Sequence, residues 1–131
     1  MYKKAYGQIG LNDFLSPYRM LDPHNRWIRI AVSVPWEDYE KKYAEQFSNK
    51  KGAPATRFRM AMGTLIIKRK LGRSDWDTLQ DIVENPYMQY LIGLEEFTAV
   101  APFSVRSISN FRKYISQPMV TEILQKYDET D

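Results

Sequence analysis

The chain has 131 residues, of which 44% are hydrophobic and 27% charged, a composition typical of globular domains that excludes disordered and fibrous chains. Its formal net charge is +3, and the lack of cysteine excludes disulfides, thiolate metal sites and cysteine catalysis. No apolar run approaches the ~20 residues that a membrane span needs, and the N-terminus lacks the apolar core of a signal peptide. We therefore expect a cytoplasmic protein without a membrane partner.

Residues 1–20 mix glycine and proline with scattered aromatic residues and show no sustained period, which predicts an extended N-terminal arm. Residues 21–131 are predicted to form a single helical domain. Asp22 and Pro23 read as the N-cap and first position of a short helix. Its predicted inner side consists of Trp27, Ile28, Ala31 and Val32.

A second predicted helix begins near Pro35. Aromatic residues recur along it at the spacing of one helix face, which favours a core stripe. The stripe consists of Trp36, Tyr39, Tyr43 and Phe47. A polar loop over residues 48–54 follows it.

The stretch 55–71 predicts the helix around which the rest of the domain is built. Its apolar residues recur on two nearly opposite sides, so the helix needs neighbours all round. At a rise of ~1.5 Å per residue it would be roughly 25 Å long, about the diameter of a small domain. Lys68, Arg69 and Lys70 place positive charge at the negative end of the helix dipole, and Gly72 suits the helix exit.

Three further helix starts follow. Ser74 is predicted to cap a helix with Trp76, Leu79, Ile82 and Val83 turned inward. Asn85 and Pro86 begin a short helix with Tyr87, Tyr90 and Leu91, which Gly93 closes. Ser104 caps a helix that runs to Ser116, with Ile108, Phe111 and Ile115 inward, and a final helix starts at Pro118. No strand signal competes, so we predict an all-α, compact multi-helix domain around the central buried helix at 55–71, with helix-turn-helix-like elements.

Charge alternates along the chain in blocks. Residues 52–73 hold six basic residues and no acid, whereas residues 74–96 hold six acids and no base. Two interpretations stay open: the blocks pair with each other inside the fold, or a segregated basic face binds phosphates.

Few residues are suited to catalysis. His24 is the single histidine, has no second imidazole to share a metal, and is expected to face solvent. Asp75, Asp77 and Asp81 could hold magnesium, but a solvated helix face or pairing with the basic end of 55–71 explains them more simply. No glycine-rich phosphate loop or activated serine is present. We therefore expect no catalytic residue, no metal, no cofactor and no small-molecule substrate in this chain.

Double-stranded DNA is a better match to the residue chemistry. The turn 71–74 has the length and glycine of a helix-turn-helix, but the helix after it is acidic and is rejected as a reader of DNA. The helix after Ser104 is free of acids and carries the groups that grip bases and phosphates. The predicted DNA contacts are Ser104, Arg106, Ser107, Ser109, Asn110, Arg112 and Lys113, with Lys68, Arg69, Lys70 and Arg73 as further backbone contacts. The alternatives are an ordinary solvated helix and, for Arg112, an ion pair inside the fold.

Three runs carry a family resemblance: LDPHNRWIRIAVSVPWEDYEKKYAEQF, RFRMAMGTLIIKRKLGRSDWDTLQDIVENPYMQYLIGL and PFSVRSISNFRKYI. Together they resemble the amino-terminal domain of bacterial insertion-sequence transposases of the DDE type, from about Leu21 to Ile115. The matching motifs include Asn25-Arg26-Trp27, Pro35-Trp36, Glu84-Asn85-Pro86-Tyr87 and Phe111-Arg112-Lys113. Typical members carry Asp-Pro where this chain has Ser104-Val105, which keeps a capping residue and loses the proline.

The resemblance implies a helical domain ahead of an RNase H-like catalytic domain, whose acidic residues bind magnesium beyond Asp131. It implies that this chain is a trimmed domain, a truncated gene product or a relic. We therefore expect a non-catalytic domain that recognises the terminal inverted repeats of a mobile element, with another transposase protomer as a further partner. The alternative is a dimerisation module without sequence-specific DNA binding, in which the aromatic surfaces of residues 36–47 or 87–94 contact the partner. A third class, a free-standing nuclease, would cut DNA with magnesium.

Overall fold

The computed structural model describes residues 21–45 and 57–128. Over these ranges the chain is all-α, as predicted, and no residue in them forms a strand. The helices are α2 (Arg26–Ser33), α3 (Trp36–Glu45), α4 (Phe58–Leu71), α5 (Asp75–Glu84), α6 (Pro86–Leu91), α7 (Val105–Tyr114) and α8 (Gln117–Tyr127). The predicted arm 1–20, the loop 48–54 and Phe47 lie outside the described residues. Within those residues, no helix has both the length and the apolar character to span a membrane.

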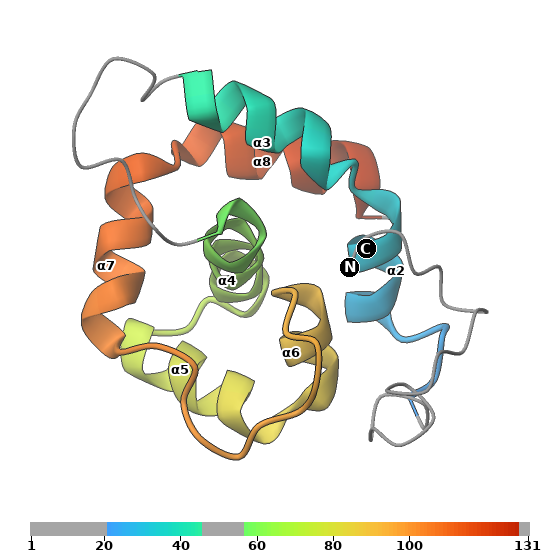
Figure 1. The fold of residues 1–131 in the computed structure, drawn as a ribbon, viewed down its shortest axis with the longest axis vertical. Coiled ribbons are helices and arrows are strands. Elements are labelled where there is room, and N and C mark those ends of the chain that lie inside the picture. Colours follow the sequence, from blue (N-terminus) through green and yellow to red (C-terminus); the bar gives the residue numbers. More distant parts are fainter. Residues whose placement is uncertain (1–20, 46–56, 129–131) are drawn as a thin grey trace.

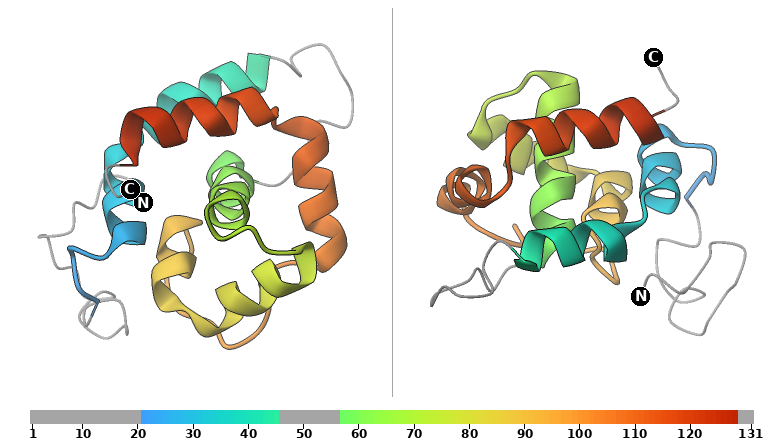
Figure 2. Two further views of the ribbon diagram at one scale, coloured as in Figure 1. Left: turned by 180° about the vertical axis from the view of Figure 1, so that it is seen from behind. Right: turned by 90° about the horizontal axis from the view of Figure 1, so that it is seen from above.

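Helix α4 is the centre of the domain, as the two apolar stripes of its sequence predicted. Figure 1 shows it nearly end-on with the other helices around it, and the right-hand view of Figure 2 shows it lengthwise. Met62, Ile66 and Ile67 have no exposed surface. The helix ends at Gly72, whose φ of 63° lies in the left-handed region that favours glycine.

Short side chains cap most of the helices. Ser74, Asn85 and Ser104 accept hydrogen bonds from backbone N–H groups one turn on, as the sequence predicted. The predicted cap of α2 is wrong: Asn25 caps this helix, and its Oδ1 accepts from the Trp27 N–H at 2.8 Å. Asp22 instead accepts from the His24 N–H, within the turn before the helix. The exposed position predicted for His24 is confirmed.

Two predicted core positions are wrong. Trp76 is 60% exposed and Val32 is 47% exposed. The buried line of α5 runs through Thr78, Leu79 and Ile82. At about 100° per residue, Trp76 lies roughly a third of a turn away from the centre of that line, so its indole faces solvent.

The aromatic stripe of α3 belongs to the core. Trp36, Tyr39 and Tyr43 are all buried. The rings of Trp36 and Tyr43 lie 6.4 Å and 5.2 Å from the ring of Phe58 at the start of α4. The stripe therefore joins α3 to the central helix.

The buried side-chain amide of Gln89 in α6 holds the segment that connects α6 to α7. Nε2 of Gln89 donates to the carbonyls of Ile82 and Thr98, each at 2.9 Å, and the Thr98 N–H donates to Oε1 of Gln89 at 2.9 Å. Gln89 has no exposed surface. The end of α5 and the long connection are thus held together, which helps to set where α7 begins.

Candidate nucleic-acid interface

Helix α7 lies at the edge of the domain and packs by one side only. Its residues Ile108 and Phe111 are buried on this inner side, and the Phe111 ring lies 5.2 Å from the Phe103 ring. On this side the helix packs against α4 and α5. Its opposite side faces outward, as Figures 1 and 2 show.

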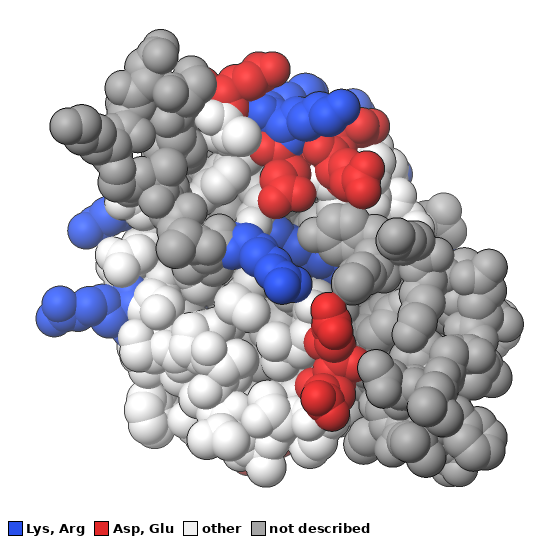
Figure 3. Space-filling model, viewed as in Figure 1, with Lys and Arg blue, Asp and Glu red and all other residues white. Residues whose placement is uncertain are grey.

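The outward side of α7 carries a stripe of three exposed polar residues. Arg106, Asn110 and Lys113 stand at i, i+4 and i+7, within about 60° of one another around the helix. The side chains of these three residues make no hydrogen bond or ion pair within residues 21–45 and 57–128. In Figure 3, basic side chains project from the edge of the molecule where α7 lies. We call these three residues the α7 stripe.

The predicted serines lie at the start and flank of the same helix. The Ser107 N–H donates to the Ser104 Oγ at 3.2 Å, and the two hydroxyls are also 3.2 Å apart. Ser107 and Ser109 are half-buried. Ser104 is therefore occupied in capping, with its hydroxyl still exposed at the end of the stripe.

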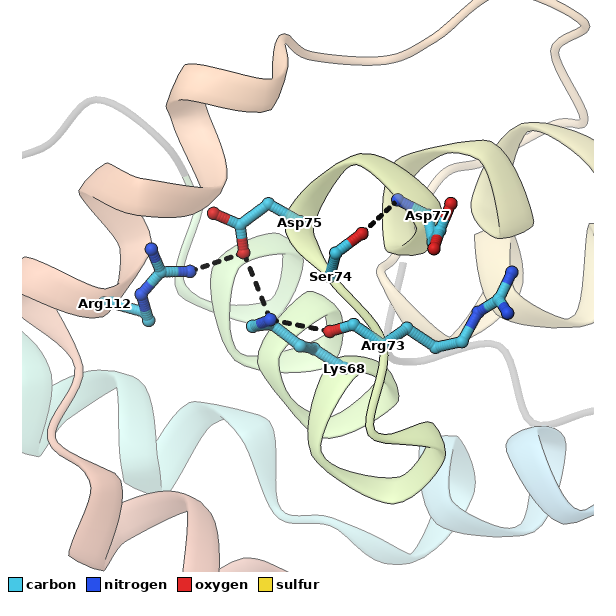
Figure 4. A network of polar contacts seen from close by, with 6 residues as sticks. All are labelled: Lys68, Arg73, Ser74, Asp75, Asp77 and Arg112. Atoms are coloured by element: carbon cyan, nitrogen blue, oxygen red, sulfur yellow. Dashed lines mark hydrogen bonds and ion pairs between the residues drawn. The ribbon is translucent and has the colours of Figure 1, made fainter.

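Arg112 points away from the stripe and into an ion pair, which confirms the alternative considered for it. Its Nη1 donates to Asp75 Oδ1 at 2.6 Å. The same oxygen lies 3.3 Å from Lys68 Nζ, which also donates to the Arg73 carbonyl at 2.7 Å. Figure 4 shows this junction of α4, α5 and α7. The hydrogen bond from Arg112, followed by that from Lys68, lowers the pKa of Asp75.

The other basic residues at the end of α4 also contact their own fold. Arg73 makes two hydrogen bonds to Asp81, at 2.9 Å and 3.1 Å. Arg69 donates to Thr121 and Gln117 of α8, and Lys70 pairs with Asp128. Pairing of the basic and acidic blocks inside the fold is thereby confirmed for Lys68 and Arg73, and Arg112 adds a pair from outside the basic block.

The same ion pairs engage two of the acidic residues of α5. Asp75 and Asp81 bind cations of the protein itself. Among the residues that the structure describes, no three acidic or histidine side chains gather where they could hold a metal ion.

The structure thus divides the predicted site residues into two sets. The α7 stripe is exposed on the outward side of α7, and Ser107 and Ser109 are half-buried on its two flanks. Arg112, Lys68 and Arg73 meet at the α5 junction, while Arg69 and Lys70 face α8 and the residue after it. The pairing of Asp75 with the basic end of α4 was among the alternatives that the sequence offered, but its pairing with Arg112 was not predicted, because the two lie 37 residues apart and no local spacing signals the contact.

The aromatic surfaces considered for dimerisation are largely used inside the domain. Trp36, Tyr39 and Tyr43 are buried, and so is Leu91 in the second segment. Tyr87 is half-buried, and its hydroxyl accepts a hydrogen bond from the Asp22 N–H at 2.9 Å. The buried members of these surfaces are therefore used inside the domain, and the alternative of dimerisation stays a prediction.

Comparison with known proteins gives one family and one curated relative. A family model described as "Transposase domain (DUF772)" matches residues 15–114, a range that includes the α7 stripe. A protein of Rhizobium meliloti named "Uncharacterized protein ORF8 in nfe locus" is 28% identical over 106 residues, which cover 81% of this chain and 51% of the relative. The chain therefore spans about half the length of that relative. No solved structure gives a significant match.

Proposed function

The chain belongs to the transposase domain family DUF772, and from that premise we propose that it is a non-catalytic domain that binds double-stranded DNA at terminal inverted repeats. The observation that carries the proposal is the α7 stripe. It is exposed, free of acids and without partners in the described fold. A solvated helix would need no such alignment of arginine, asparagine and lysine.

Each residue of the stripe has a chemistry that suits the major groove. The Arg106 guanidinium can donate two hydrogen bonds to guanine, and the Asn110 amide can pair with adenine. Lys113 can neutralise a phosphate. From Arg106 to Lys113 the helix rises about 10 Å, the length of about three base pairs.

The remaining predicted contacts have smaller proposed roles. The Ser104, Ser107 and Ser109 hydroxyls lie where a phosphate or base edge would flank the stripe. Lys68, Arg69, Lys70, Arg73 and Arg112 are already engaged, so they would contact DNA only by sharing or exchanging their present partners. Strand cleavage and transfer, with its magnesium, would belong to a catalytic domain outside this chain.

The test is a titration of a labelled inverted-repeat duplex with the wild type and with Arg106→Ala/Lys113→Ala. Because each residue contributes a cation to the interface, we expect the double variant to bind at least tenfold more weakly. The slope of log affinity against log salt should fall in magnitude by about one, because Lys113 is the residue assigned to a phosphate. Arg26→Ala/Lys41→Ala removes the same charge from α2 and α3 and serves as the matched control. Equal affinity of the two double variants would show that α7 does not form the interface.

A further inference from the structure

The junction in Figure 4 holds two cations from different helices on one carboxylate oxygen. Arg112 Nη1 lies 2.6 Å and Lys68 Nζ 3.3 Å from Asp75 Oδ1. We propose that Asp75 occupies the place of a DNA phosphate at this junction and thereby limits the affinity of the domain for DNA. This inference rests on the proposed function of α7.

The position of Arg112 supports the proposal. It lies on the same helix as the α7 stripe, about 120° around from the centre of the stripe, so it faces the flank of a duplex lying on α7. Backbone phosphates border the groove on that flank. The junction is therefore placed for a phosphate contact rather than for a base contact.

The exposure of the three side chains allows the exchange. Arg112, Lys68 and Asp75 are 37%, 27% and 22% exposed, so a phosphate oxygen can approach both cations from solvent. Only one nitrogen of the Arg112 guanidinium is engaged by residues of the described fold. A phosphate binds guanidinium and ammonium groups through the same charge-assisted hydrogen bonds as a carboxylate does.

The charge balance gives the direction of the effect. Lys68, Arg112 and Asp75 together carry a net charge of +1, whereas the two cations alone would carry +2. A carboxylate beside an incoming phosphate also repels it. Removing the charge of Asp75 therefore frees two cations and relieves one repulsion.

The experiment measures affinity of the inverted-repeat duplex for Asp75→Asn, Arg112→Gln and the double variant, over a range of salt. We expect Asp75→Asn to bind the duplex about three- to tenfold more tightly at low salt. Its slope of log affinity against log salt should be steeper by about one. Asp77→Asn is the matched control. It removes the same charge from the same turn of α5, but Asp77 has no ion-pair partner in the described fold, so we expect less than a twofold change.

The double variant separates the proposal from general electrostatics. In the Arg112→Gln background, the gain from Asp75→Asn should be smaller than in the wild type, because only Lys68 is left to be released. An equal gain from both Asn variants, or a loss of affinity in Asp75→Asn, would overturn the proposal. Asp75→Ser provides a second neutral side chain if thermal melting shows that the Asn variant is unfolded.

Failure of this proposal is distinguishable from failure of the proposed function. Wild-type binding that depends on Arg106 and Lys113 but does not respond to Asp75→Asn contradicts only the inference about Asp75. Absence of wild-type binding contradicts the function itself.

Discussion

Asp75 is bound by cations from two neighbouring helices, and this makes the stability of the domain depend on pH. The pKa of its carboxyl group is lowered, first by the Arg112 hydrogen bond and second by Lys68. A lowered pKa means that the stabilisation is complete above the unfolded value of about 3.9 and is lost as pH falls through the folded value.

We therefore predict that the free energy of unfolding decreases as pH falls below about 4, and that Asp75→Asn decreases less steeply. Urea denaturation at several pH values and constant ionic strength measures both slopes. Part of the slope should persist in the variant, because the hydrogen bond from Tyr39, followed by that from Lys126, lowers the pKa of Glu122. Identical slopes in the wild type and the variant would show that the Asp75 pairs contribute nothing to stability.

Trp76 is expected to contribute little to folding in spite of its size. Its side chain is 60% exposed, whereas that of Trp27 is 2% exposed. We predict that Trp76→Ala changes the free energy of unfolding by about 0.5 kcal/mol or less, and that Trp27→Ala costs about 3–5 kcal/mol. Chemical denaturation of both variants measures the difference. A cost above about 2 kcal/mol for Trp76→Ala would mean that the indole is buried in solution.

Among the helix contacts, α4 lies close to the end of α6 at Gly63. A Cβ atom at this position would lie 3.1 Å from Ile92 Cα and 3.2 Å from the Leu91 carbonyl oxygen. In an exposed helix, alanine in place of glycine stabilises by up to about 1 kcal/mol. Here the contacted atoms are backbone, which cannot move without shifting the end of α6.

We predict that Gly63→Ala destabilises the domain by about 1–2 kcal/mol, because overpacking outweighs the gain in helix propensity. Thermal melting of the variant and the wild type gives the sign directly. A higher melting temperature would show that α6 can move away from α4 at little cost.

Local signals explain which elements the sequence could predict. The caps at Ser74, Asn85 and Ser104 depend on residues within one turn, so the sequence was sufficient to find them. The start of α2 was not predicted correctly, since Asp22 and Asn25 are both capping residues and local sequence does not distinguish them. The Asp22 N–H bonds to Tyr87, 65 residues away, and only the folded chain shows that contact.

The candidate site also has a part that the sequence could predict and a part that required the structure. The α7 stripe follows from helical spacing alone, because residues at i, i+4 and i+7 share one face. The pair between Arg112 and Asp75 required the folded structure, since α5 and α7 are joined by a long connection. The sequence did not predict the orientation of Trp76 correctly. An apolar side chain in the first turn of a helix can lie in the core or at the surface, and the local sequence does not distinguish the two.

At the scale of the whole molecule, one central helix organises both the core and the charges. Helix α4 is buried from Phe58 to Ile67 apart from the half-buried Met60, and the cations at its end contact α5 and α8 or the residues that flank them. Lys68 and Arg73 of the basic block pair with Asp75 and Asp81 of the acidic block within the fold. At the edge of the molecule, Arg106 and Lys113 of α7 are exposed, and we propose that they bind an external anion.

We propose that α7 reads DNA sequence rather than only attracting phosphates. The most direct test titrates this chain against labelled inverted-repeat and scrambled duplexes at several salt concentrations. We predict that both affinities fall as salt is added, while the ratio between them stays well above one, because base contacts in the groove are less sensitive to salt than phosphate contacts. Equal affinity for the two duplexes at every salt concentration would contradict the claim.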